Sequence, residues 1–133
     1  MKSSSNDRKP EFELTQEVDG LLPENRWRRK MTLEELAENI AAWGEARGII
    51  TNGTAEAQCL KLGSEYGELC DNLAKGRYQA AKDDIGDMIV VLIMISEIID
   101  TNLKECLLTA WDDIKDRKGY FNGKVFIKEG DDE

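Results

Sequence analysis

The sequence of 133 residues contains no histidine, and this absence excludes several kinds of site. Without histidine the chain has no Ser-His-Asp triad, no histidine general base and no histidine metal ligand. Di-iron carboxylate bundles are excluded as well, because they pair an acidic residue with a histidine at i, i+3. Any chemistry must therefore use carboxylates, lysine, arginine, hydroxyl groups or cysteine.

Cysteine is scarce, and long apolar runs are absent. Cys59, Cys70 and Cys106 form no CxxC pair, so we expect neither a disulfide framework nor a zinc knuckle but buried, reduced thiols. The longest apolar run, Met88–Ile95, is far shorter than the ~20 residues that a membrane span needs. The N-terminal residues also lack the apolar segment of a secretory signal. We therefore expect a cytoplasmic protein with no membrane partner.

Positive charge is in deficit, with 18 Lys and Arg against 27 Asp and Glu, which gives a net charge of −9. An acidic chain repels phosphate backbones, so we expect no nucleic-acid partner. The length and the 41% hydrophobic content fit one soluble globular domain with a modest core.

Proline is rare, and both prolines, Pro10 and Pro23, lie in a polar N-terminal stretch. We interpret residues 1–30 as a flexible or loosely docked arm, residues 31–128 as the helical domain and residues 129–133 as an acidic tail. A basic cluster around Trp27 is either part of a solvated linker or an anion contact.

Apolar periodicity and capping signals predict helices over residues 33–47, 55–75, 78–99 and 103–117. Thr32 with Glu35, Thr54, and Asn102 with Glu105 are the expected N-terminal caps. Residues 49–53 should form a turn, and Asn122-Gly123 between short apolar stretches predicts a hairpin over residues 120–127. The predicted fold class is all-α, a four-helix bundle with a short C-terminal β-hairpin-like segment.

The third predicted helix is apolar on every side in its second half, from Met88 to Ile95. Such a helix must be surrounded by other apolar surfaces. Because a chain this short offers few partners for it, we infer that a second subunit covers one side.

Acidic pairs flank the turn at Gly76. Glu65 and Glu68 are spaced i, i+3 before it, and Asp84 and Asp87 are spaced i, i+3 after it. This spacing places both acids of a pair on one side of a helix. A short reversal at Gly76 would pack the two helices antiparallel, so that four carboxylates converge.

Four converging carboxylates repel one another unless a cation binds them. Oxygen ligands without histidine or cysteine favour Mg²⁺, with Mn²⁺ as the alternative. Because Mg²⁺ usually joins carboxylates to substrate phosphates, the site predicts phosphate chemistry. The alternative is a solvated acidic surface, which is common on helices.

The nearby cations and aromatics have two interpretations each. Lys61, four residues before Glu65, either pairs with the acids or reaches a phosphate. Three cations near the end of the fourth helix either favour the helix dipole or clamp a polyphosphate; they are Lys115, Arg117 and Lys118. Trp43 is either a core residue or a platform that stacks on a base.

The segment GSEYGELCDNLAKGRYQAAKDDIGDMIVVL resembles the all-α nucleoside triphosphate pyrophosphohydrolases of the MazG-like family, whose signature is EExxE, a spacer, then ExxD. Glu65 and Glu68 match the last two acids of the first half, and Asp87 matches the final aspartate. Asp84 stands where the family usually has Glu, and Ser64 where it usually has the leading Glu. The first departure keeps the charge but shortens the side chain.

The resemblance implies a four-helix fold of this type, a homodimer or homotetramer, and Mg²⁺-dependent hydrolysis of a nucleoside triphosphate between the α and β phosphates. In that mechanism Glu65, Glu68, Asp84 and Asp87 hold the metal, and Glu65 orients or deprotonates the attacking water. Lys61, Lys115, Arg117 and Lys118 would bind phosphates, and Trp43 the base. A phosphoribosyl-ATP pyrophosphohydrolase and a non-catalytic helical dimer that binds a nucleotide or a protein are the alternatives.

Overall fold

The computed structural model describes residues 25–130. The chain forms two units, Met1–Asn39 and Ile40–Glu133. The first contains α1 (Arg26–Lys30) and the beginning of α2 (Leu33–Ala46). Residues 1–24 of the predicted arm and residues 131–133 of the predicted tail lie outside the described residues.

The start of α2 has the predicted capping box. The backbone N–H of Thr32 donates to Glu35 Oε1 at 3.0 Å, and the backbone N–H of Glu35 donates to Thr32 Oγ1 at 3.0 Å. These two bonds satisfy orphan donors of the first turn. The prediction of this helix start is confirmed.

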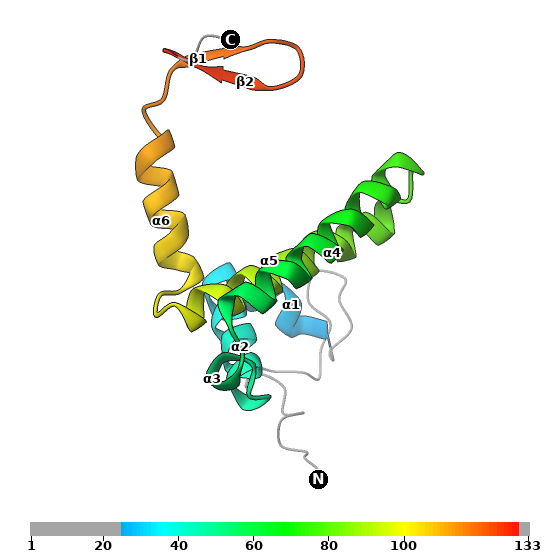
Figure 1. Cartoon of the computed structure of the whole chain (residues 1–133), viewed down its shortest axis with the longest axis vertical. Helices are drawn as coiled ribbons and strands as arrows, with labels where there is room; N and C mark the ends of the chain where they lie inside the picture. Colours follow the sequence, from blue (N-terminus) through cyan, green and yellow to red (C-terminus); the bar gives the residue numbers. More distant parts are fainter. Residues whose placement is uncertain (1–24, 131–133) are drawn as a thin grey trace. The chain divides into compact units, whose positions relative to one another are not determined.

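The second unit is built around two long helices, α4 (Ala55–Ala74) and α5 (Tyr78–Ile98). They pack side by side and form the largest helix–helix contact of residues 25–130 (Figure 1). Thr54 Oγ1 accepts the N–H of Ala57 at 3.1 Å and caps α4. Gly76 has φ +71°, a conformation that suits glycine, and it allows the chain to reverse between the helices. The predicted antiparallel reversal is present.

Shorter elements complete this unit. The predicted turn after α2 contains a single helical turn, α3 (Ile49–Asn52), because Gly48 at φ +80° ends α2 and the chain then resumes helical hydrogen bonding. The last helix, α6 (Leu103–Ile114), is capped by Asn102, whose Oδ1 accepts the N–H of Glu105 at 2.8 Å.

The C-terminal hairpin pairs β1 (Gly119–Phe121) with β2 (Phe126–Lys128), with Tyr120 opposite Ile127. Asn122 Oδ1 accepts the N–H groups of Lys124 and Val125 at 2.9 Å and shapes the turn. The predicted fold class, all-α with a short C-terminal hairpin, is confirmed.

The core of the described residues is small and lies mainly on α5. Ile93 and Met94 are its largest fully buried side chains, and Met94 packs against Gly44 of α2. All three cysteines are exposed, so the expectation that they are buried is wrong. Cys59 and Cys70 lie on α4 and Cys106 lies on α6, and neither helix has a buried residue. Among the described residues, no helix combines the length and the apolar character needed to cross a membrane.

Candidate metal centre

Three of the four predicted acids come together between α4 and α5. Glu65 lies on α4, and Asp84 and Asp87 lie one helical turn apart on α5. One carboxylate oxygen from each of the three lies within 4.8 Å of the other two. We call these residues the acidic cluster. Their spacing is short enough for one cation to contact all three after small side-chain adjustments.

The fourth predicted acid, Glu68, is exposed and lies outside this group. Residues three apart on a helix differ by roughly 60° in direction, because each residue advances about 100°. The side chain of Glu65 therefore lies against α5, while that of Glu68 lies beside the interface. The i, i+3 rule correctly made them neighbours on α4 but did not decide which one faces α5.

Asp84 is the most buried acid of the cluster, with 5% of its surface exposed. Asn72 of α4 donates from Nδ2 to Asp84 Oδ2 at 2.6 Å. The sequence analysis missed Asn72, although it lies seven residues after Glu65, a spacing that returns to the same side of a helix. The amide satisfies one Asp84 oxygen and leaves further acceptor capacity on the carboxylate.

Glu65 contributes an oxygen without a protein donor. Its side chain is 13% exposed, and Oε1 is buried with no hydrogen-bond partner among the described residues. Its other oxygen, Oε2, lies 3.6 Å from Lys61 Nζ. A buried acceptor without a donor is costly in a folded protein, so an atom of this kind indicates a ligand position.

The pKa of Asp87 reflects the negative charges gathered around it. Loss of hydration by burial raises the pKa of the Asp87 carboxyl, and the negative charges of Asp83, Glu65 and Asp84 raise it further. Lys61 opposes this change, but the net direction is upward. A cation at the cluster would offset the repulsion that these like charges create.

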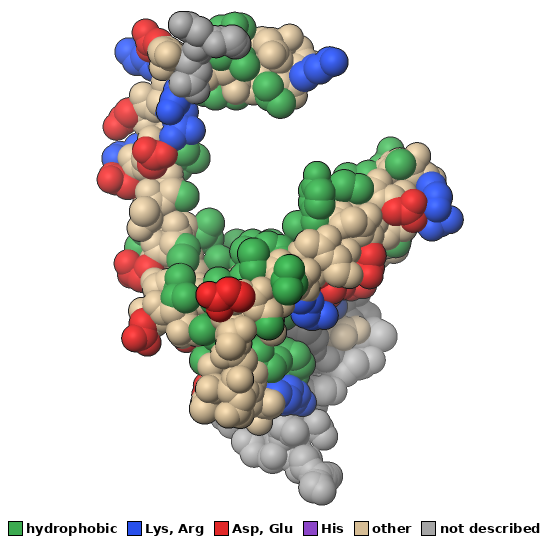
Figure 2. All heavy atoms as spheres, viewed as in Figure 1, with side chains coloured by type: hydrophobic (Ala, Val, Ile, Leu, Met, Phe, Trp, Pro, Cys, Tyr) green, Lys and Arg blue, Asp and Glu red, His purple; other side chains and the backbone are tan. Residues whose placement is uncertain are grey.

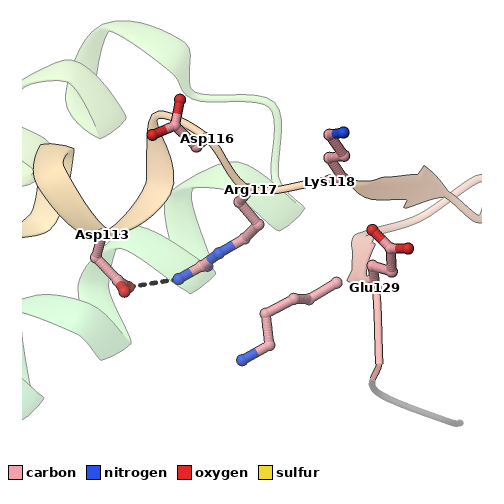
Figure 3. Close-up of a pocket in the computed structure, with 6 residues that line it drawn as sticks. Asp113, Asp116, Arg117, Lys118 and Glu129 are labelled. Carbon is pink, nitrogen blue, oxygen red and sulfur yellow. Dashed lines mark hydrogen bonds and ion pairs between the residues drawn. The ribbon is translucent and has the colours of Figure 1, made fainter.

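Two of the three predicted cations near the end of α6, Lys115 and Arg117, form local ion pairs. Lys115 Nζ lies 2.6 Å from Asp112 Oδ1 and 3.8 Å from an Asp116 oxygen, and Arg117 pairs with Asp113. Arg117 and Lys118 line an open hollow of about 440 Å³ together with residues of both signs (Figure 3). Within the described residues, none of the three cations makes an ion pair with the acidic cluster.

Trp43 lies on α2, is 45% exposed and carries the guanidinium of Arg47 over its ring at 5.0 Å. It is therefore not a core side chain. This contact occupies one side of the ring, and nothing among the described residues joins it to the acidic cluster.

Comparison with known proteins gives one informative match. The chain is 38% identical over 65 residues to an uncharacterized 18.2 kDa protein encoded in the rep-hol intergenic region of Haemophilus phage HP1. The match covers 49% of this chain and 40% of that protein, so the chain spans well under half of the relative's length. No protein-family model and no solved structure matches the chain. Membership of the MazG-like family stays a prediction.

Proposed function

We propose that the protein is a Mg²⁺-dependent nucleoside triphosphate pyrophosphohydrolase, which releases a nucleoside monophosphate and pyrophosphate. The observation that carries the proposal is the cluster of Glu65, Asp84 and Asp87, whose carboxylate oxygens lie within 4.8 Å of one another. Glu65 also has a buried oxygen, Oε1, with no hydrogen-bond partner among the described residues. The resemblance of the acid spacing to the MazG-like signature supplies the reaction.

The donor set fits Mg²⁺. All three candidate ligands are carboxylates, the sequence has no histidine, and no cysteine belongs to the cluster. Mg²⁺ binds through a few carboxylates while keeping waters and substrate phosphates as its remaining ligands. Mn²⁺ accepts the same oxygen ligands and is the alternative. When bound, the ion would polarise phosphate oxygens and lower the pKa of a coordinated water.

The protein groups have distinct proposed roles. Glu65 would hold the attacking water, and its Oε1 has no hydrogen-bond partner among the described residues that would compete for it. Lys61, whose side chain is 58% exposed beside Glu65, can turn from the carboxylate to a phosphate. Glu68 is exposed three residues further along α4, outside the cluster, so its proposed part in holding the ion rests on the resemblance. Asn72 fixes the orientation of Asp84.

The proposed substrate contacts on α6 and α2 require side chains to change their present partners. Lys115 and Arg117 would have to leave their aspartate partners, and Trp43 would stack with the base on the side away from Arg47. Exposed ion pairs of this kind contribute little energy, so a polyphosphate can displace them.

A non-catalytic nucleotide-binding protein is the second candidate. Asp84 has a shorter side chain than Glu, and its amide partner holds it in a buried position. With Asp84 held in this position, the site would bind a metal-nucleotide complex but would leave the attacking water poorly placed for hydrolysis. A phosphoribosyl-ATP pyrophosphohydrolase has the same metal site and differs in substrate.

The test is a screen of nucleoside triphosphates and phosphoribosyl-ATP, with Mg²⁺ and with EDTA, that measures monophosphate and pyrophosphate. We expect Mg²⁺-dependent release of both products, and at least a hundredfold loss of rate in Glu65→Gln. Asp83→Asn is the matched control, because it removes a neighbouring charge without removing a cluster ligand. Nucleotide binding without products would favour the second candidate. The absence of both nucleotide binding and products would refute the enzymatic and the non-catalytic candidates alike.

A further inference from the structure

One side of α4 is exposed and carries no charge. Counting about 100° per residue, positions 59–74 contain a continuous arc of roughly 140° that points away from α5. Its residues are all exposed and all apolar or small, namely Cys59, Leu60, Gly63, Tyr66, Gly67, Cys70, Leu73 and Ala74. We call this surface the α4 face. An exposed helix side in a chain with 34% charged residues would normally carry several charges.

The apolar surface continues on α5, where Tyr78, Ile85, Ile89 and Leu92 are between 41% and 70% exposed. Figure 2 shows hydrophobic side chains gathered along one edge of the α4–α5 pair and acidic side chains mainly along the other. A Cβ atom added at Gly63 or Gly67 would meet nothing within 4 Å. The α4 face therefore has open space at its two glycines, which large side chains of another element can approach closely, while Leu60, Tyr66 and Leu73 remain exposed beside it.

The segment from α6 to the hairpin also exposes apolar side chains, most of which are large. Every residue from 104 to 126 is exposed. Large side chains dominate its apolar surface, with Leu107, Trp111 and Ile114 on one side of α6 and further aromatics on the hairpin, namely Tyr120, Phe121 and Phe126. We call residues 103–128 the arm, which is a different segment from the predicted N-terminal arm of residues 1–30. A helix of 12 residues and a two-stranded hairpin are each marginally stable alone, so the arm needs a surface to cover it.

The small core shows how much burial is missing. Among the described residues, the buried hydrophobic side chains are Ala81, Val91, Ile93 and Met94. Six aromatic residues on the arm and the α4–α5 pair are at least 49% exposed. At ~150–250 Å² for each aromatic side chain, these alone offer roughly 550–900 Å² per copy. A stable protein–protein interface buries about 800 Å² on each partner.

We infer that two copies of the chain associate with the arm of each copy packed against the α4 face of the other. Large side chains on the arm can pack into the open space at Gly63 and Gly67, beside the larger exposed side chains of the α4 face, Leu60, Tyr66 and Leu73. One two-fold operation covers all four surfaces. The absence of charge from the α4 face also suits a chain of net charge −9, since no acid of that face enters the contact. This inference is independent of the proposed enzymatic activity.

The experiment uses the full chain without nucleotide or Mg²⁺. Analytical ultracentrifugation should show a dimer for the wild type, and a tetramer would be a pair of such dimers. Gly67→Glu in the α4 face and Trp111→Glu in the arm should each weaken association by about a hundredfold or more, because each buries an unpaired carboxylate.

Mixing the two variants distinguishes the reciprocal arrangement from the others. The mixed pair keeps one intact contact, between the unchanged arm of the Gly67→Glu chain and the unchanged α4 face of the Trp111→Glu chain. The mixture should therefore form dimers where neither variant does alone. A wild-type monomer would overturn the inference, including a monomer whose residues 1–24 cover the face. A mixture that stays monomeric would also overturn it.

Cross-linking tests the same contact where a variant fails to fold, as judged by circular dichroism. One chain keeps only Cys70 on the α4 face, and the other keeps only Cys106 on α6, with the remaining cysteines changed to serine. A short bismaleimide should join Cys70 to Cys106 between different chains. Cross-links only between identical cysteines would contradict the arm-to-face contact.

Discussion

Asn72 and Asp84 are joined across the α4–α5 interface by a hydrogen bond of 2.6 Å, from the amide Nδ2 to the carboxylate Oδ2. Asp84 is almost fully buried, so this amide donor offsets part of the cost of placing a carboxylate there. The bond therefore links the stability of the helix pair to the orientation of a candidate metal ligand.

Asn72→Ala should lower the free energy of unfolding by about 1–3 kcal/mol, because a buried acceptor loses its donor. Urea denaturation in EDTA is the measurement. Asp84→Ala in the same background is the control, since removal of both partners should cost less than the sum of the single changes. Additive effects in this cycle would show that the bond does not couple the two helices.

Asp87→Asn should stabilise the protein in EDTA and weaken its response to Mg²⁺. Burial and like charges raise the pKa of Asp87 above its ordinary value of 3.8. The folded chain therefore holds this proton more tightly than the unfolded chain, and the ionised carboxylate opposes folding near pH 7. Without metal, stability should increase as the pH falls through the raised pKa toward 3.8.

Differential scanning calorimetry with EDTA and with Mg²⁺ checks this prediction. A specific ligand of the native state raises Tm, so wild type should show a Mg²⁺-induced increase that Asp87→Asn largely loses. Asp83→Asn relieves some repulsion but should keep the increase. Equal Mg²⁺ responses in all three proteins would argue against a metal at the cluster.

Local signals in the sequence predicted the helices well. Thr32, Thr54 and Asn102 have the capping bonds expected of them, and Gly48 and Gly76 adopt the positive φ that ends α2 and α4. These features depend on residues within one helical turn of one another. They can therefore be predicted without knowledge of the packing.

The candidate site was predicted in part, because it depends on how α4 is rotated against α5. The i, i+3 spacing and the reversal correctly brought Glu65, Asp84 and Asp87 together. The spacing and the reversal did not reveal that Glu68 faces solvent or that Asn72 donates a hydrogen bond to Asp84. A rotation of roughly 60° about the α4 axis exchanges such positions, and capping signals carry no information about that rotation.

Gly44→Val should destabilise the second unit by about 1–3 kcal/mol, because overpacking forces neighbouring side chains from their preferred positions. A Cβ atom at Gly44 would lie 2.2 Å from Met94 Sδ, and Met94 is 1% exposed. Thermal unfolding is the measurement. Gly86→Ala is the matched control, since a Cβ there meets nothing within 4 Å and alanine favours helix. Similar losses in both variants would show that the contact with Met94 is unimportant.

Gly119→Ala should open the C-terminal hairpin while leaving the helices intact. A Cβ atom at this position would lie 2.0 Å from the carbonyl oxygen of Ile127 on the paired strand, so the strands must separate. Hydrogen exchange at the β1 and β2 amides should become faster, and circular dichroism should retain the helical signal.

Gly123→Ala is the contrasting variant. A Cβ atom there meets no atom within 4 Å, but Gly123 stands at φ +99° in the turn, where alanine is strained. If the arm packs against a second copy, Gly119→Ala should also weaken association. Unchanged exchange rates in Gly119→Ala would show that the strands do not approach each other this closely in solution.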